Sequence, residues 1–218
     1  MHFLVLGGSG QNGTLVIQEA LARGHSVTAM VRNPATLKID PHPQLTVVKG
    51  TPESLSDTKS ALTTPSPPSA VIITLGMTAN SPANFLARAT QTLLTALREL
   101  DLADNKTKLV VNSSHGVGAS APSLLLAFHL LFSVWPRMRL SQAAHEEADN
   151  LVMASGLKFV VARPARLTAG EAAEVKAYSD SGKGIGAMPS ISRASVAKWL
   201  VSAAETAEWD GRAPVLAN

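Results

Sequence analysis

Short apolar runs alternate with longer segments of mixed character along this chain of 218 residues. β-Branched and aliphatic runs bounded by Gly, Pro or polar residues are typical of buried parallel strands. The predicted strands cover 2–6, 27–31, 45–49, 70–74, 108–112 and 157–162. Segments with helical spacing of apolar residues lie between most of them, at 14–23, 53–62, 82–100 and 142–154. This alternation predicts an α/β fold, with a doubly wound parallel sheet and helices on both faces.

The first predicted strand runs directly into a glycine-rich segment. Gly8, Gly10 and Gly13 fit the spacing G-x-G-x-x-G, and Gly7 with the last two fits a looser spacing. Glycine allows a tight turn and a close approach of the backbone to a pyrophosphate at a helix N-terminus. Because a strand precedes the segment and a helix follows it, the segment predicts dinucleotide binding.

The second predicted strand ends at Arg32, which Asn33 follows. Proteins that bind NAD usually carry a carboxylate here for the ribose 2′-hydroxyl. A guanidinium group instead pairs with a 2′-phosphate, and no acidic residue stands here to repel that phosphate. The alternative is an exposed arginine that begins a loop. We therefore predict NADP(H) as the cofactor.

Composition is that of a single soluble domain spanning residues 1–218, with 45% hydrophobic and 16% charged residues. A net charge of +3 with scattered basic residues does not indicate nucleic-acid binding. The sequence has no cysteine and no paired histidine spacing, so no metal site is predicted. No basic, hydrophobic leader precedes the first strand, and we expect a cytoplasmic protein.

Ligands in open parallel sheets lie beyond the carboxyl ends of the strands. The segments that follow the predicted strands are therefore the ones to inspect. We expect one cleft edge to bring together 7–13, Arg32, 75–77, 113–115 and 164–167.

Several short motifs occur in a fixed order: Gly-Gly-Ser-Gly-Gln-Asn-Gly at 7–13, Val31-Arg32-Asn33, Ser113-Ser114, Ser155-Gly156-Leu157-Lys158 and Ala162-Arg163-Pro164. This ordered set resembles the atypical short-chain dehydrogenase/reductases. Within that group it is most similar to the NmrA-like branch and to the biliverdin-IXβ reductase/flavin reductase proteins. The similarity extends through 191–197 and 208–211, and it is weakest at 115–141.

The resemblance implies a Rossmann domain that binds NADPH and, in the reductases, delivers hydride to a flat conjugated acceptor. By position, the glycine segment would hold the pyrophosphate, and Ser114 and Pro164 would lie near the nicotinamide. Segments 113–141 and 165–191 would form the substrate-side loops, the latter within a small C-terminal region. The expected cofactor-binding residues are Gly7, Gly10, Gln11, Asn12, Gly13, Arg32, Asn33, Leu75, Gly76, Met77, Ser113 and Pro164.

The sequence departs from the family pattern at three places. Gly50-Thr51 stands where Gly-Asp is frequent, and Ser195 stands where Asp is frequent; both changes would weaken cofactor binding without abolishing it. The Tyr/Lys pair of ordinary short-chain dehydrogenases is missing. The single tyrosine, Tyr178, precedes a predicted surface hairpin at 179–184, so we expect a structural or substrate-rim role for it.

Two residues are predicted to act on the substrate. His145 is the expected proton donor, because histidine titrates nearest to neutral pH, and the alternative is an ordinary histidine on a helix face. Hydride transfer to a conjugated system can also take its proton from water. Ser114 is expected to hydrogen-bond the carboxamide or the substrate carbonyl, unless it caps backbone groups instead. The role of His115 is open.

The segment 122–136 is apolar on nearly every side and too short to span a bilayer. It predicts a wall over an apolar substrate, with a homodimer interface and a membrane-surface contact as alternatives. The chain as a whole predicts an NADPH-dependent reductase of a conjugated apolar small molecule, such as a flavin, quinone or enone. An NADP-binding redox sensor without turnover and a non-redox isomerase or cyclase remain alternatives, because fold does not decide between them.

Overall fold

The computed structural model describes residues 1–103, 106–124 and 135–218. The strands are β1 (His2–Leu6), β2 (Ser26–Val31), β3 (Leu45–Lys49), β4 (Ala70–Ile73), β5 (Lys108–Asn112), β6 (Phe159–Pro164), β7 (Arg166–Thr168), β8 (Lys176–Tyr178), β9 (Ser190–Ser192) and β10 (Val215–Ala217). The helices are α1 (Gln11–Ala22), α2 (Leu55–Thr63), α3 (Phe85–Glu99), α5 (Pro136–Met153) and α6 (Arg193–Glu205), with short 3-10 turns η1 (Pro34–Thr36) and η2 (Gly118–Ser123).

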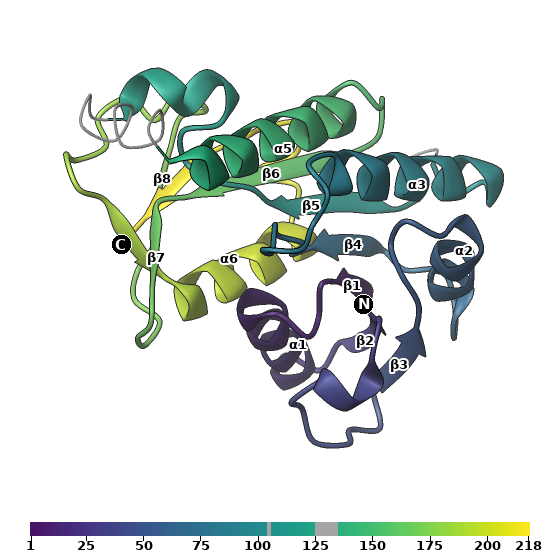
Figure 1. Ribbon diagram of the computed structural model, residues 1–218. Coiled ribbons are helices and arrows are strands. Elements are labelled where there is room, and N and C mark those ends of the chain that lie inside the picture. Colours follow the sequence, from purple (N-terminus) through teal and green to yellow (C-terminus); the bar gives the residue numbers. More distant parts are fainter. Residues whose placement is uncertain (104–105, 125–134) are drawn as a thin grey trace.

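One large sheet organises the described residues, with the strand order β3-β2-β1-β4-β5-β6-β10-β8 (Figure 1). All neighbouring strands are parallel except β8, which pairs antiparallel with β10. The chain order reverses between β1 and β4, which places the loops after these two strands beside each other. Sheets of this kind bind ligands at such a switch point. The predicted doubly wound α/β fold is confirmed.

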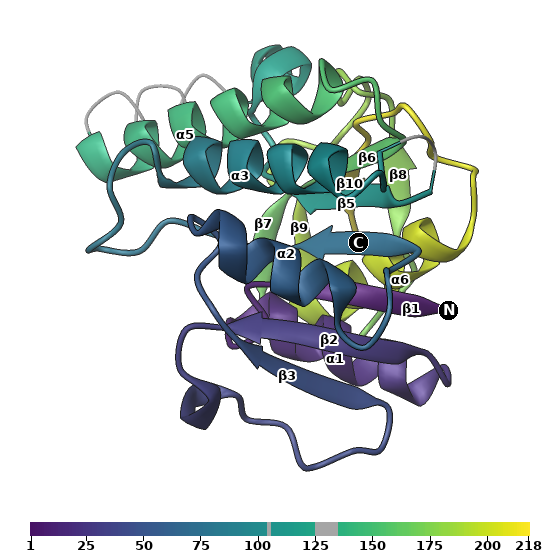
Figure 2. The same ribbon diagram turned by 90° about the vertical axis from the view of Figure 1, so that its right-hand side faces the viewer.

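Helices cover both faces of the sheet because successive strand residues point to opposite sides. From β1, Phe3 and Val5 pack into the core under α1 and α6. Leu4 and Leu6 pack into the second core, under α2, α3 and α5. Figure 2 shows these last three helices in front of the sheet, with α1 and α6 behind it.

Several boundaries differ from those predicted. Helix α1 begins at Gln11 and so contains Gly13, a residue that usually weakens helices. Helix α5 begins at Pro136 instead of 142, because proline at the first helical position favours a start that apolar spacing does not reveal. Strand β6 covers Phe159–Pro164 because Gly156, with a φ of +79°, lies in the turn that follows α5.

The C-terminal region contains short strands that hydrophobic spacing does not reveal. Strands β7 and β9 form a separate parallel pair. The predicted surface hairpin at 179–184 is wrong, because β8 pairs with β10 instead, with Tyr178 opposite Val215. Tyr178 packs against the core that α1 and α6 cover.

Candidate functional site

The loop between β1 and α1 has a shape that only glycine allows. Gly7 has a φ of +86°, and a Cβ atom on it would lie 2.8 Å from the carbonyl oxygen of Thr74. A Cβ on Gly13 would lie 2.2 Å from the carbonyl oxygen of Gly7. The Gly10 N–H donates to that same oxygen at 2.9 Å and closes the turn. The predicted tight turn is therefore required by backbone contacts.

This loop delivers the chain to the N-terminus of α1 without a side-chain cap. Gly10 is the N-cap residue, and the first turn contains no acidic residue. Gln11 is exposed, whereas Asn12 is buried and its Oδ1 atom has no hydrogen-bond partner among the described residues. An uncapped helix start with a glycine turn presents backbone N–H groups to an anion.

A first hollow lies at the carboxyl ends of β1, β2 and β4, beside this loop. Its lining includes Gly7, Gly10, Arg32, Leu75 and Gly76, all predicted from the sequence. Ser9, Gly50, Pro52, Thr74, Thr78, Ser81 and Phe85 line it as well. Several residues of this second group follow β3 or β4. Their position directly after a predicted strand is the sequence feature that could have identified them.

Arg32 is exposed and makes no hydrogen bond or ion pair with any described residue. Asp and Glu are absent from the lining of the first hollow. Asn33, by contrast, uses its Oδ1 atom to accept from the Ala35 N–H at 3.1 Å, which caps η1, and it does not line the hollow. The guanidinium group of Arg32 is therefore free to meet an anion.

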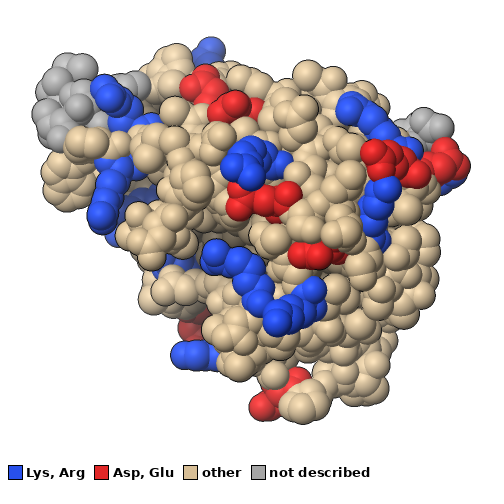
Figure 3. Space-filling model, turned by 45° about the vertical axis from the view of Figure 1, so that its right-hand side comes forward, with Lys and Arg blue, Asp and Glu red and all other residues tan. Residues whose placement is uncertain are grey.

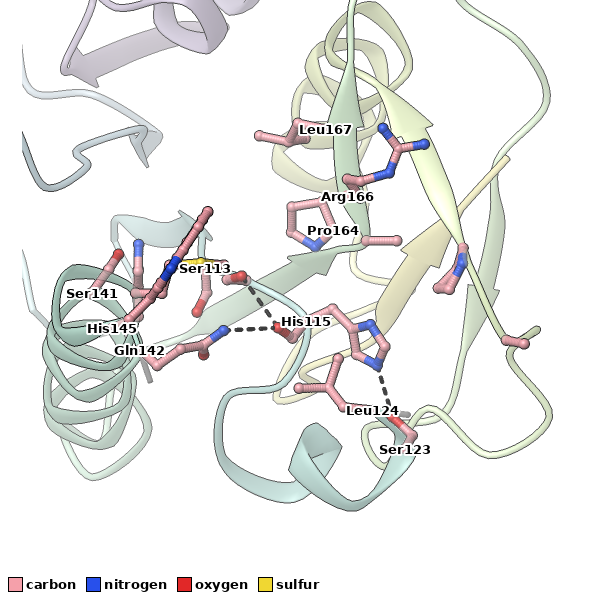
Figure 4. Close-up of a pocket in the computed structure, with 16 residues that line it drawn as sticks. Ser113, His115, Ser123, Leu124, Ser141, Gln142, His145, Pro164, Arg166 and Leu167 are labelled. Carbon is pink, nitrogen blue, oxygen red and sulfur yellow. Dashed lines mark hydrogen bonds between the residues drawn. The ribbon is translucent and has the colours of Figure 1, made fainter. Parts of the chain in front are cut away.

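A second hollow of about 480 Å³ lies beyond β5 and β6. Figure 4 shows α5 supplying Ser141, Gln142 and His145 from one side, and β6 and β7 supplying Pro164 and Leu167 from another. Its lining is mostly apolar, and its volume is in the range of small-molecule sites, roughly 300–1,000 Å³. Ser113, Ser114 and Pro164 all line it.

The sequence predicted that these segments meet at one cleft edge. In the structure they are divided between two hollows at the same end of the sheet. A small apolar cluster connects their walls. Phe85, which lines the first hollow, packs with Ala144, the neighbour of His145 in the second. Met77 packs against this cluster and does not line the first hollow.

Burial changes the chemistry expected of the two histidines. Desolvation lowers the pKa of His145 from 6.5 to about 4, so its ring is neutral near pH 7. Burial also lowers the pKa of His115, whose Nε2 atom lies 2.8 Å from the Ser123 hydroxyl oxygen. Neither ring is therefore positively charged near pH 7.

Two hydrogen bonds meet in the loop after β5, and one of them comes from α5. The backbone oxygen of His115 accepts from Ser114 Oγ at 3.2 Å and from Gln142 Nε2 at 3.3 Å (Figure 4). The Ser114 hydroxyl thus already has a backbone acceptor, which is the capping alternative considered from the sequence. Its proton can still turn to a ligand, because a hydroxyl rotates about its bond to carbon.

A buried polar network lies beneath Ser113. The Ser113 hydroxyl donates to Asp149 Oδ2 at 2.8 Å, and Arg163 Nη2 lies 3.6 Å from the same oxygen. Burial raises the pKa of Asp149 to about 6, although the serine and the arginine act to lower it. Gly118, with a φ of +54°, lies so close that a Cβ there would approach Arg163 Nη2 to 2.9 Å. Of this network, Ser113 lines the second hollow.

The prediction for the apolar segment 122–136 lies largely outside the described residues. Of its described positions, Ser123, Leu124 and Trp135 line the second hollow, and Trp135 is 58% exposed. A substrate wall, a homodimer interface and a membrane-surface contact stay predictions.

Within the described ranges, no group of three or more Asp, Glu or His residues could hold a metal ion. No helix of the described chain is both long and apolar enough to cross a membrane. Basic and acidic side chains are interspersed on the face shown in Figure 3.

The fold and the glycine loop define a dinucleotide-binding Rossmann domain. Residues 7–207 match a family model described as NAD(P)H-binding. The chain belongs to this NAD(P)H-binding family, which confirms the resemblance to the atypical short-chain dehydrogenase/reductases.

Solved structures share the fold at low sequence identity. ChuY, an anaerobillin reductase from Escherichia coli O157:H7, is 19% identical with a TM-score of 0.79, and the match covers 100% of this chain and 97% of that one. A short-chain dehydrogenase/reductase from Veillonella parvula DSM 2008, solved with NADP, is 16% identical with a TM-score of 0.74, covering 100% and 94%. A Rossmann-fold NAD(P)-binding protein from Shigella flexneri is 21% identical with a TM-score of 0.71, covering 99% and 92%.

Proposed function

We propose that this protein is an NADPH-dependent reductase that transfers hydride to a conjugated apolar small molecule of the flavin, quinone or enone type. The observation that carries the proposal is the mostly apolar second hollow, which opens at the same end of the sheet as the glycine loop. One relative in fold, ChuY, is described as an anaerobillin reductase, which supports a redox role.

The first hollow would hold NADPH. A Cβ at Gly7 or Gly13 would collide with backbone, so glycine is required there to keep the turn before α1 tight. The uncapped start of α1, with Gln11 and Asn12, would bind the pyrophosphate. Leu75 and Gly76 would lie along the ribose.

Arg32 would bind the 2′-phosphate, because its guanidinium group has no partner within the described chain and no carboxylate lines the hollow beside it. A relative in fold was solved with NADP, which supports this choice of cofactor.

When bound, NADPH supplies a hydride. Ser114 and Pro164 would orient the nicotinamide and the acceptor, since both line the second hollow. His145 would act as a neutral hydrogen-bonding group instead of an imidazolium acid, because burial holds its pKa at about 4. A proton for the reduced acceptor would then come from water. A hydride from the cofactor and a proton from water together suit acceptors whose reduction begins with hydride transfer.

The test is an assay in which NADPH absorbance is recorded after purified protein is mixed with NADPH and one acceptor. The acceptors are FMN, riboflavin, quinones and conjugated ketones. Acceptor-dependent oxidation supports the reductase, and conversion of an acceptor with the cofactor unchanged would indicate the non-redox isomerase or cyclase. NADPH binding without any conversion across the panel would contradict the reductase and favour a redox sensor.

A further inference from the structure

The second hollow contains a single permanent charge. Arg166 is the one Arg, Lys, Asp or Glu among the described residues that line it. The two histidines in the lining have pKa values that burial lowers, so both are neutral near pH 7. An arginine stays charged at any pH at which the protein is folded.

Arg166 is held on a fixed backbone. It is the first residue of β7 and pairs with Ser190 of β9, while its neighbour Leu167 pairs with Ile191. Figure 4 shows the side chains of Arg166 and Leu167 leaving the strand on opposite sides. Arg166 is thus an exposed residue of the lining, carried on the paired strands β7 and β9.

The guanidinium group of Arg166 makes no hydrogen bond or ion pair within the described chain. Other arginines are engaged: Arg163 lies beside Asp149, Arg23 bonds Glu205, and Arg212 lies 3.5 Å from Asp180. Of the arginines without such a partner, Arg32 and Arg166 are the two that line the hollows described above. Each hollow thus offers one unpaired cation and no carboxylate.

We propose that the second hollow takes a flat, largely apolar ligand that carries an anionic substituent, a carboxylate or a phosphate, and that Arg166 binds this anion. The inference rests on the proposed function in treating the ligand as the hydride acceptor. The planar guanidinium fork pairs with both kinds of anion through two parallel hydrogen bonds. Apolar walls accommodate the conjugated part, and the arginine gives the ligand one orientation.

The experiment compares ligands that differ only in the anion. FMN and riboflavin share the same ring system, and FMN adds a terminal phosphate. Dissociation constants are measured by quenching of flavin fluorescence with the intact chain. The unsubstituted protein is expected to bind FMN about tenfold more tightly than riboflavin, as for one charge-assisted hydrogen bond. Arg166→Gln should weaken FMN binding to the level of riboflavin and leave riboflavin binding unchanged.

A second pair separates the two kinds of anion. Anthraquinone-2-carboxylate and its methyl ester are flat and differ in charge. A preference for FMN alone assigns the phosphate, and a preference for the carboxylate alone assigns the carboxylate; each supports the proposal if Arg166→Gln removes it. Arg166→Lys should retain part of the preference, because lysine keeps the charge but loses the fork.

Two variants serve as controls. Arg139→Gln removes an exposed arginine of α5 that does not line the hollow, and it should leave the preference intact. Arg32→Gln tests whether the phosphate binds in the first hollow. The proposal is overturned if Arg32→Gln abolishes the preference for the anionic ligand, or if neither pair of ligands binds. It is also overturned if the two members of each pair bind equally, or if Arg166→Gln weakens both members equally. These titrations need no turnover, so they remain interpretable even if no acceptor oxidises NADPH.

Discussion

The two hollows at the carboxyl edge of the sheet are built in different ways. The first depends on backbone: a glycine turn, the uncapped start of α1 and the ends of three strands. The second depends on side chains from the loops after β5 and β6, from α5 and from the segment before β9. Each contains one arginine without a partner among the described residues, Arg32 or Arg166. A backbone-built site tolerates few substitutions, whereas a side-chain-built site sets which ligand is accepted.

The largest effect is expected for Gly13→Ala. Its Cβ would lie 2.2 Å from the Gly7 carbonyl oxygen, so the loop must distort. We expect a loss of about 3 kcal/mol of stability, as for overpacking, together with loss of NADPH binding. Gly186→Ala is the matched control, because a Cβ there meets nothing within 4 Å and Gly186 lines neither hollow. Thermal unfolding and NADPH titration of both variants test this, and equal stability of the two would contradict it.

The lowered pKa of His145, in the lining of the second hollow, predicts that the stability of the fold depends on pH. Its folded pKa of about 4 lies below the ordinary 6.5, so the unfolded chain binds a proton that the folded chain does not. The contribution of His145 to stability should therefore fall as the pH is lowered from 6.5 to 4. His145→Asn should remove about 2–3 kcal/mol of that loss, at about 1.4 kcal/mol per pKa unit.

Urea unfolding at pH 7 and pH 4 measures the effect of His145. Asp149 has a raised pKa and so contributes with the opposite sign, gaining stability as the pH falls through about 6. This contribution is present in both proteins and cancels in the comparison. If stability changes equally between pH 7 and pH 4 in the protein and in its variant, His145 is not a partly buried ring that the fold keeps neutral.

The charge of the first hollow is tested by Arg32→Glu. The change removes the guanidinium group and places a carboxylate beside the expected 2′-phosphate. We expect NADPH binding to weaken by about 1.5–3 kcal/mol, the range of a charge-assisted hydrogen bond, with NADH binding changed far less. Arg139→Glu makes the same change of charge on the exposed side of α5 and should preserve the preference. Unchanged NADPH affinity in Arg32→Glu would remove Arg32 from the site.

The smallest effect is expected for Ser114→Ala. Its hydroxyl bonds the His115 backbone oxygen and would turn to the ligand. Loss of one neutral hydrogen bond is worth about 1 kcal/mol, or roughly fivefold in kcat/KM for the acceptor. Ser141→Ala, from α5 in the same hollow, should change it less. Steady-state rates compare the two serines, and an unaltered rate in Ser114→Ala would leave that residue with its capping role alone.

Local patterns predicted most of the fold and of the first hollow. The strands up to β6 appear as apolar runs, and the glycine spacing predicts the turn because its cause, contact between Gly7 and Gly13, is local. Strands β7 to β10 were missed, since three-residue strands have no measurable periodicity.

The second hollow was predicted less well because its properties arise from tertiary packing. The burial that keeps His145 neutral comes from packing of α5. The engagement of Asn33 in capping η1 depends on a turn that the sequence did not reveal. Arg166 had no motif to mark it; its importance follows from the absence of any other permanent charge among the described residues that line the hollow.

In the proposed function, the two hollows hold two reactants, NADPH in the first and an anionic acceptor in the second. The most direct measurement is initial-rate kinetics of Arg32→Glu and Arg166→Gln with NADPH and FMN varied in turn. We predict that Arg32→Glu raises the KM for NADPH alone and that Arg166→Gln raises the KM for FMN alone. If both variants raise the same KM, or neither changes any KM, the assignment of one reactant to each hollow is contradicted.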